Sequence, residues 1–272
     1  MPKITTQSLK ARYRYSAVLL KQLVVTDFKL RYQGSFLGYL WSLLRPLAIF
    51  LIMYIVFLRF LRFDYGVPYS ALYLLLGIVL WNFFADVTST GLGSIAGKGD
   101  LLRKINFPKY VVVLAVLFGS LINLFLNFLV IGIFMAVSHV DIAPRILWAI
   151  PLLLELLMLG LAFAFLLSAL FVKLRDMSYI WEVLLQATFY ATPIFYPLIL
   201  VPSVYAKWML LNPIAQIVQD LRYVIITPKT PTIADYWDSD LIRLVPIAIV
   251  VAIALFSAHY FRKHSRHFAE EI

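Results

Sequence analysis

Six long runs of apolar residues constrain the fold of this chain more than any other feature of its sequence. They lie at about residues 37–60, 68–88, 110–138, 146–172, 179–200 and 241–261. A helix of about 20 apolar residues crosses the hydrocarbon core of a bilayer. The pattern therefore predicts an all-α integral membrane protein with six transmembrane helices. The fifth run is the least regular, because Pro193 and Pro197 interrupt it.

The composition excludes the main alternatives to a membrane protein. Apolar residues make up 62% of the 272 residues and charged residues 14%, whereas soluble domains are about 45–50% apolar and about 25% charged. A soluble fold of this size could not bury such an excess, and a disordered chain is poor in apolar residues. The absence of cysteine from the sequence excludes disulfides and Cys-ligated zinc. We expect about six spans and no soluble catalytic domain.

The basic residues predict how the chain is oriented in the membrane. The formal net charge is +10, and most Lys and Arg residues fall on one side if the N-terminus is cytoplasmic. Because basic residues gather in cytoplasmic loops and meet anionic lipid, both termini are expected in the cytoplasm, and no nucleic-acid partner is expected. The predicted organisation is a cytoplasmic segment 1–36, a six-span domain 37–261 and a cytoplasmic tail 262–272.

The N-terminal segment is polar and basic for roughly 15 residues, so we expect no cleavable signal peptide. After it, Ala17, Leu20, Val24 and Phe28 recur at helical spacing, with Leu19 and Leu23 beside them. This pattern predicts a basic amphipathic helix that lies in the membrane interface.

Two connecting segments have their own patterns. Residues 91–108 form a glycine-rich connection whose second half, 100–106, predicts a short amphipathic helix on the cytoplasmic side. Residues 196–240 hold five prolines and two apolar patches, 198–201 and 208–211. These patches are too short to span, so we expect re-entrant helices that are buried against protein.

Motifs for catalysis are weak. Gly97-Lys98 resembles part of a phosphate-binding loop, but Leu92 stands where that loop needs its first glycine and Gly99 follows the lysine. His264 and His267 belong to a basic helix end, which favours a membrane anchor over a metal site. We therefore expect no enzyme activity and no cofactor in this chain.

Ionisable residues within the apolar runs cost about 2.5–3.5 kcal/mol each at a helix centre. Asp86 and Glu182 lie near span ends, where an interfacial position would satisfy them. Glu155 lies deeper and either pairs within the bundle or belongs to a transport pathway. Asn123 and Asn127 share a face with Ser120, which favours hydrogen bonds between helices.

Aromatic residues make up 16% of the chain, more than interfacial anchoring of Trp and Tyr requires. Aromatic faces stack on sugar rings, so a path lined with them could pass a sugar chain. Phe189 and Tyr196 are seven residues apart and would share one helix face, and Pro193 would bend that helix and turn free carbonyls toward the path. The candidate wall residues are Tyr39, Trp41, Phe189, Tyr190, Phe195 and Tyr196.

Four segments, in this order, resemble the permeases of polysaccharide and teichoic acid ABC exporters. They are Arg31-Tyr-Gln-Gly-Ser-Phe-Leu-Gly-Tyr-Leu-Trp-Ser-Leu-Leu-Arg-Pro46, Lys104-Ile-Asn-Phe-Pro108, Ala191-Thr-Pro-Ile-Phe-Tyr196 and Leu211-Asn-Pro-Ile214. The resemblance implies a homodimer in a bacterial cytoplasmic membrane, paired with two copies of a separate ATPase subunit that holds ATP and Mg. It also implies export of a lipid-linked glycopolymer of the O-antigen, teichoic acid or galactan type.

The same resemblance implies an interfacial helix at 16–31 and re-entrant helices after the fifth span. A coupling helix is implied near 97–106, where Leu101, Leu102 and Ile105 could fill an apolar groove on the ATPase. The expected coupling residues are Lys98, Asp100, Leu101, Leu102, Arg103, Lys104 and Ile105.

Two points stay open. Arg45 could meet the diphosphate of a lipid-linked substrate, because a guanidinium matches phosphate geometry, or it could pair with an acid such as Glu182. The substrate could also be a small lipophilic drug or a lipo-oligosaccharide, and a secondary transporter or channel would need no ATPase.

Overall fold

The computed structural model describes residues 6–62, 66–105, 107–237 and 239–268, and these ranges contain helices and loops but no strand. The predicted all-α class is confirmed. The principal helices are α1 (Thr6–Tyr32), α2 (Trp41–Met53), α3 (Ser70–Ser94), α4 (Gly99–Lys104), α5 (Tyr110–Val137), α6 (Ala149–Lys173), α7 (Met177–Ala191), α8 (Ser203–Met209), α9 (Pro213–Ile225), α10 (Ile233–Trp237) and α11 (Leu244–His264). Short helical turns join them: η1 (Gly38–Leu40), η2 (Tyr54–Phe60), η3 (Ala96–Lys98), η4 (Pro144–Trp148), η5 (Leu198–Leu200) and η6 (Asp240–Arg243).

Five helical segments of the described chain are long and apolar enough to cross a membrane. They are Trp41–Phe60, Ser70–Ser94, Tyr110–Val137, Pro144–Lys173 and Asp240–His264, and they match five of the six predicted spans.

The predicted fifth span, 179–200, differs from the structure. Its helix α7 has 15 residues and ends at Ala191, which gives about 22 Å at about 1.5 Å per residue against a hydrocarbon core of about 30 Å. Thr192 is extended because the proline ring of the next residue disfavours helical geometry before it. A single continuous helix over this span is therefore wrong.

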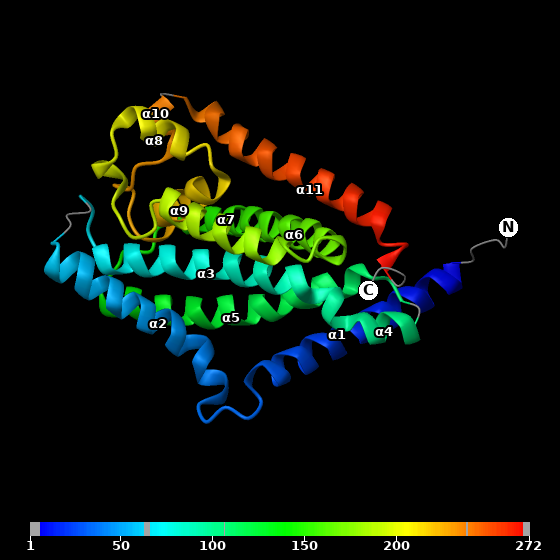
Figure 1. Ribbon diagram of the computed structural model, residues 1–272. Helices are drawn as coiled ribbons and strands as arrows, with labels where there is room; N and C mark the ends of the chain where they lie inside the picture. The colour runs from blue at the N-terminus through cyan, green and yellow to red at the C-terminus, as the bar shows by residue number, and fades with distance from the viewer. Residues whose placement is uncertain (1–5, 63–65, 106, 238, 269–272) are drawn as a thin grey trace.

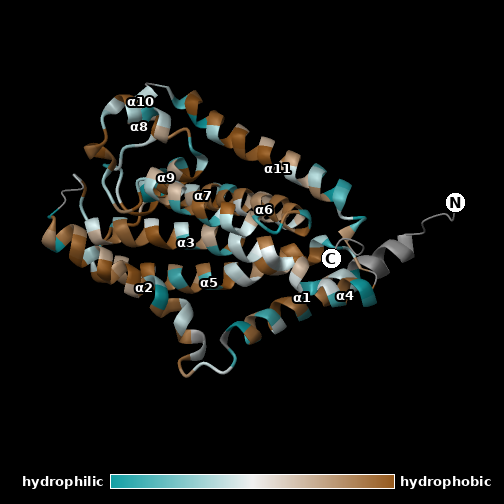
Figure 2. Ribbon diagram, viewed as in Figure 1, coloured by the Kyte–Doolittle hydropathy of each residue, from teal (hydrophilic) through white to brown (hydrophobic). Residues whose placement is uncertain are grey.

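Helix α3 lies at the centre of the bundle and contacts α2, α5, α6, α7 and α9, while α11 packs on α6. The start of α1, α4 and the end of α11 lie at one end of the bundle, and α8 and α10 lie at the other (Figure 1). The long helices are mainly hydrophobic, whereas hydrophilic residues gather on α1, on α4 and at the end of α11 (Figure 2). The start of α1 belongs to the predicted cytoplasmic segment 1–36, and the end of α11 leads into the predicted tail 262–272. The structure brings both to the same end of the bundle.

The N-terminal helix is longer than predicted and covers its own bundle. Leu23 is buried, Leu20 and Val24 pack against the core, and α1 lies against α5. Ala17, which was predicted to share this apolar face, is exposed. Much of the apolar face therefore contacts protein.

The helices after α7 do not follow the predicted apolar patches. The first patch forms only the turn η5, and the second ends the short helix α8. The longest helix of this segment is α9, where the Asn212 side chain accepts a hydrogen bond from the Ile214 amide at 3.1 Å and Pro213 takes the first position. Capping chemistry starts this helix, and burial of 11 of its 13 residues holds it in the bundle.

Candidate functional site

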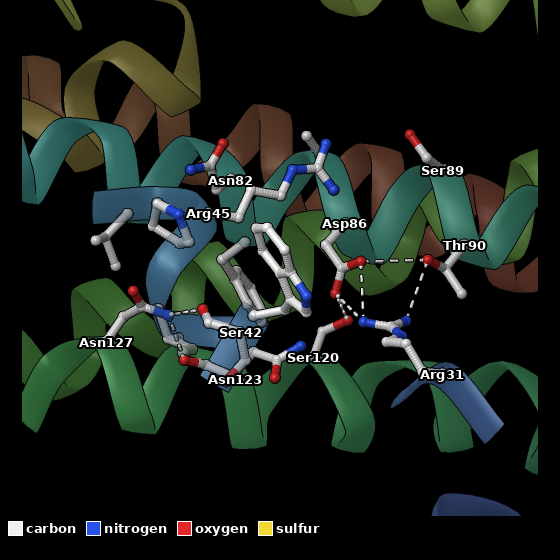
Figure 3. Close-up of a pocket in the computed structure, with 16 residues that line it drawn as sticks. Arg31, Ser42, Arg45, Asn82, Asp86, Ser89, Thr90, Ser120, Asn123 and Asn127 are labelled. Carbon is white, nitrogen blue, oxygen red and sulfur yellow. Dashed lines mark hydrogen bonds and ion pairs between the residues drawn. The ribbon is translucent and has the colours of Figure 1, made fainter. Parts of the chain in front are cut away.

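A cavity of about 730 Å³ opens between α2, α3, α5 and the end of α1 (Figure 3). Its wall is unusually polar for a bundle of apolar helices, with two arginines, one carboxylate and several hydroxyls and amides. Such groups are rare within membrane spans and are commonly functional there. The polar lining residues are Arg31, Ser42, Arg45, Asn82, Asp86, Ser89, Thr90, Ser120, Asn123 and Asn127.

Asp86 of α3 is the centre of a polar cluster in this cavity. It forms an ion pair with Arg31 at 3.1 Å, and the Ser120 hydroxyl donates to it at 2.6 Å. The Thr90 hydroxyl, one turn along α3, donates to Asp86 at 3.3 Å. The sequence predicted only an interfacial position near a span end for Asp86, whereas the structure adds partners from α1 and α5 to its carboxylate. The ion pair joins α1 to α3, and the Ser120 bond joins α5 to α3.

A second set of hydrogen bonds fixes the start of α2. Pro46 lies inside this helix and has no N–H to donate to the Ser42 carbonyl, four residues earlier. The side-chain amide of Asn127 donates to that carbonyl instead, at 3.3 Å. The predicted hydrogen bonds between helices are thus confirmed for Asn127 and Ser120. The Asn127 bond holds the first turn of α2 against α5, and the Ser120 bond holds α5 against α3.

Arg45 extends from this fixed part of α2 into the cavity (Figure 3). Within the described residues, it has no hydrogen bond or ion pair to another side chain. The alternative partner, Glu182, is exposed on α7 and does not pair with it there. Trp41 also lines the cavity, and 49% of its surface is exposed. The side chain of Tyr39, another predicted wall residue, is not among the described parts of the structure.

The other predicted wall residues form a separate aromatic cluster at the end of α7. The ring of Phe195 lies 5.4 Å from that of Phe189 and 5.1 Å from that of Phe57. Phe189 also contacts Trp81 of α3, with 5.5 Å between ring centroids. Tyr190 is 57% exposed. The predicted wall residues therefore fall into two groups, because the 730 Å³ cavity is not lined by Phe189, Tyr190, Phe195 or Tyr196.

The helical-face argument for this cluster is wrong. Since α7 ends at Ala191, Phe189 and Tyr196 do not lie on one helix, and the Tyr196 hydroxyl instead donates to the Tyr190 carbonyl at 3.0 Å. The Phe189 carbonyl, which Pro193 leaves without its helical donor, accepts from the Thr192 amide at 3.4 Å instead of facing a path. The carbonyls of Pro193 and Ile194 accept from Arg222.

Arg222 of α9 lies next to this aromatic cluster, and the sequence analysis did not predict it as a site residue. Its guanidinium is fully buried and donates to the carbonyls of Tyr73, Pro193 and Ile194 at 2.7–2.9 Å. It also lies 3.7 Å from the centroid of the Tyr73 ring. Arg222 belongs to segment 196–240, where the sequence predicted re-entrant helices but no buried cation. Gly77 of α3 is one trace of this buried arginine in the sequence, because a Cβ at position 77 would lie 2.3 Å from the Arg222 guanidinium.

The predicted coupling segment forms η3 and α4, and Ile105 after it is extended. Lys98 pairs with Asp27 of α1, a link that was not predicted. Leu102 is buried in this chain's own core, whereas 41% of Ile105 is exposed, so Leu102 is not available to fill a groove on a partner. Asn106, the predicted end of this helix, lies outside the described residues.

Glu155 of α6 is buried and near Asp220 of α9. The Gln216 amide donates to Asp220 at 2.6 Å, and one Glu155 oxygen has no hydrogen-bond partner among the described residues. The described residues contain no group of three His, Cys, Asp or Glu side chains that could hold a metal ion. The polar cavity itself holds two guanidinium groups, of which that of Arg31 is paired with Asp86.

Comparisons with known proteins agree with this architecture. The family model described as "ABC-2 type transporter" matches residues 18–226. The O-antigen export system permease protein RfbA of Myxococcus xanthus is 29% identical over 266 residues, which cover 96% of this chain and 97% of that protein. Two proteins of the same name from Klebsiella pneumoniae are 27% and 28% identical over 220 residues, 79% of this chain and 83% of each relative. With a match that runs from α1 through α9, this chain belongs to the ABC-2 type transporter family, as a permease subunit of an exporter.

Proposed function

We propose that this chain is the transmembrane subunit of an ATP-driven exporter that moves a lipid-linked glycopolymer across the cytoplasmic membrane. Two copies would form the path, and two copies of a separate ATPase subunit would supply the energy. The relatives are O-antigen export permeases by name, which favours a glycopolymer over a small drug or lipo-oligosaccharide. Family membership favours an ABC exporter over a secondary transporter.

The cavity beside Arg45 is the observation that carries this proposal. Its volume lies within the range of about 300–1,000 Å³ that is usual for ligand sites. Asp86 offsets the charge of Arg31, but no acid among the described residues pairs with Arg45. A diphosphate between a lipid and a sugar chain carries the charge that this guanidinium would bind. We therefore assign the diphosphate of the substrate to Arg45.

The test replaces Arg45 by Gln and compares it with Arg59→Gln. Arg59 lies further along the same predicted span, in η2, and its guanidinium packs over the Tyr54 ring. Both variants lose one positive charge. We expect Arg45→Gln to reduce export of polymer to the cell surface by at least about tenfold, the loss expected from removing a charged hydrogen bond of about 1.5–3 kcal/mol. Arg59→Gln should export normally.

Membrane levels of each variant and its co-purification with the ATPase subunit are measured beside export. Normal export by Arg45→Gln would exclude the assigned diphosphate contact. Loss of the protein from the membrane, or of the ATPase from the purified complex, would show that Arg45 holds the bundle together instead.

The segment around α4 is proposed as the contact with the ATPase subunit. Asp100, Arg103, Lys104 and Ile105 are exposed and Leu101 is half-buried. Lys98 joins this segment to α1 through Asp27, so a movement of α4 would be passed to the N-terminal helix. In this proposal segments 1–36 and 262–272 face the cytoplasm.

The exposed side of α2 and α7 is proposed as the wall of the path in a dimer. Only 11% of the most apolar stretch of Trp41–Phe60 is buried within one chain. The ring of Tyr190 is 57% exposed and contacts Phe195, whose ring also contacts Phe57 of η2. A second copy that faces these rings would enclose an aromatic surface suited to stacking on sugars. Helix α9, which is buried against α3 and α6, would act as the re-entrant helix.

A further inference from the structure

A second cavity, of about 480 Å³, lies at the end of the bundle where α11 ends and α5 begins. Its lining combines three basic residues, Lys109, Arg262 and Arg266, with apolar residues that include Phe165, Phe261 and Ala258. It is separate from the polar cavity beside Arg45, which lies between α2, α3 and α5. The export function proposed above does not involve this second cavity.

The basic part of this lining is partly preorganised. Lys109 donates to the Ser265 carbonyl at the end of α11 and lies 5.9 Å from the centroid of the Phe268 ring. Arg262 and Arg266 are exposed, and neither pairs with an acid among the described residues. All of the residues that line the cavity are neutral or basic. An anion is therefore the ligand with complementary charge.

The apolar part of the lining continues along a membrane-facing helix. The rings of Phe165 and Phe261 meet edge to face, with 4.8 Å between centroids. The lining residues of α11 extend from Ala258 to Arg262, over about 6 Å at about 1.5 Å per residue. Leu255 and Phe256, just before it on the same helix, are 69% and 59% exposed. The cavity thus joins a group of basic side chains to an exposed apolar helix face.

We infer that this cavity binds the headgroup of an anionic phospholipid from the cytoplasmic leaflet, with an acyl chain along α11. Basic pockets between helices at this depth suit lipid phosphates. An acidic segment of a protein partner would match the charges but not the apolar surface that leads toward the centre of the membrane. Because Lys109 follows α4 by five residues, a bound lipid would also hold the connection between α4 and α5.

The test titrates the full chain, in a neutral detergent, with micelles that contain phosphatidylglycerol or phosphatidylcholine with the same acyl chains. Inorganic phosphate is the third ligand, and the melting temperature is the readout. We expect phosphatidylglycerol alone to raise the melting temperature. Arg262→Gln should raise the half-maximal lipid concentration about 5-fold, as expected from loss of one basic side chain near an anionic headgroup. Lys263→Gln, a neighbour that does not line the cavity, should stay within about 2-fold of the unchanged protein.

A second variant keeps every charge. Ala258 is exposed, so Ala258→Trp can fill the apolar end of the cavity without disturbing the core, and it should also weaken the response to phosphatidylglycerol. Equal stabilisation by phosphatidylcholine, or by inorganic phosphate alone, would overturn the assignment to an anionic lipid. So would an equal loss in Lys263→Gln, which would indicate diffuse surface charge. A normal lipid response of Arg262→Gln, combined with loss of the ATPase on purification, would assign the cavity to the protein partner.

Discussion

Helices α3 and α11 are both apolar enough to cross a membrane, but they occupy opposite environments. The most apolar stretch of α3 is 78% buried within the chain, and that of the segment containing α11 is 17% buried. Of the five candidate spans, α3 is nevertheless the least apolar and α11 is among the most apolar. Apolarity therefore does not rank these helices by burial, because lipid tails are as apolar as a leucine side chain.

Small and polar residues distinguish the two helices better. Helix α3 carries glycines at positions 77 and 91, where a Cβ would lie 2.3 Å from Arg222 and 2.6 Å from the Ala164 Cβ. It also carries Asp86, which bonds to two other helices. Helix α11 has no glycine in its sequence. Close approach of backbones needs small residues at the contact, and α3 has them on several sides.

The largest effect is expected where α3 meets the buried arginine of α9. Gly77→Ala would displace the Arg222 guanidinium from its three carbonyl partners, and a broken buried charge contact costs about 3–5 kcal/mol. We expect the yield of folded protein in detergent to fall sharply and its melting temperature to drop. Gly119→Ala in α5 is the control, because no atom lies within 4 Å of its Cβ position. Similar melting of the two variants would contradict the proposed role of Arg222.

The comparison between α3 and α11 can be tested directly with one chemical change. Leu80→Ala removes a fully buried side chain of α3, whereas Leu255→Ala removes one of α11 that is 69% exposed. Core deletions of this kind cost about 2–5 kcal/mol, and changes at exposed sites are usually within about 0.5 kcal/mol. Unfolding in detergent should separate the two variants clearly. An equal loss would mean that a second copy of the chain covers α11.

A smaller effect is expected where α3 contacts α6. Gly91→Ala would force its new methyl group against Ala164, and overpacking of this kind costs about 1–3 kcal/mol. Gly93→Ala, two residues along the same helix, meets no atom within 4 Å and should gain up to about 1 kcal/mol from helix propensity. The double variant Gly91→Ala, Ala164→Gly should recover part of the lost melting temperature. Failure of this rescue would place the strain elsewhere.

Local patterns in the sequence predicted much of the site but not its partners. The segment that leads into α2 predicted Trp41 and Arg45, and both line the polar cavity. Asn127 was predicted to bond between helices, and it does so at a carbonyl that Pro46 leaves free. The partner of Asp86 could not be predicted, because Arg31 lies 55 residues away in the sequence and no local spacing relates the two.

The errors have the same origin. Arg222 has the charge of a loop residue, but contacts with Tyr73, 149 residues away, make its burial possible. Leu102 fits the apolar side of a docking helix, yet the chain's own core covers it. Helix α7 ends at Ala191, so the seven-residue spacing of Phe189 and Tyr196 does not place the two rings on one helix face.

The sequence by itself determined the all-α membrane class and five of the long helices. These properties follow from the composition and the spacing of neighbouring residues, which set the free energy of transfer to lipid and the local backbone geometry. Only the tertiary structure decided which apolar helix lies at the centre, which cation is buried and which arginine in the cavity pairs with the carboxylate. Those outcomes depend on close contacts between segments that are distant in the sequence. The free energy of transfer from water does not predict them, because it is similar for a leucine that faces protein and for one that faces lipid.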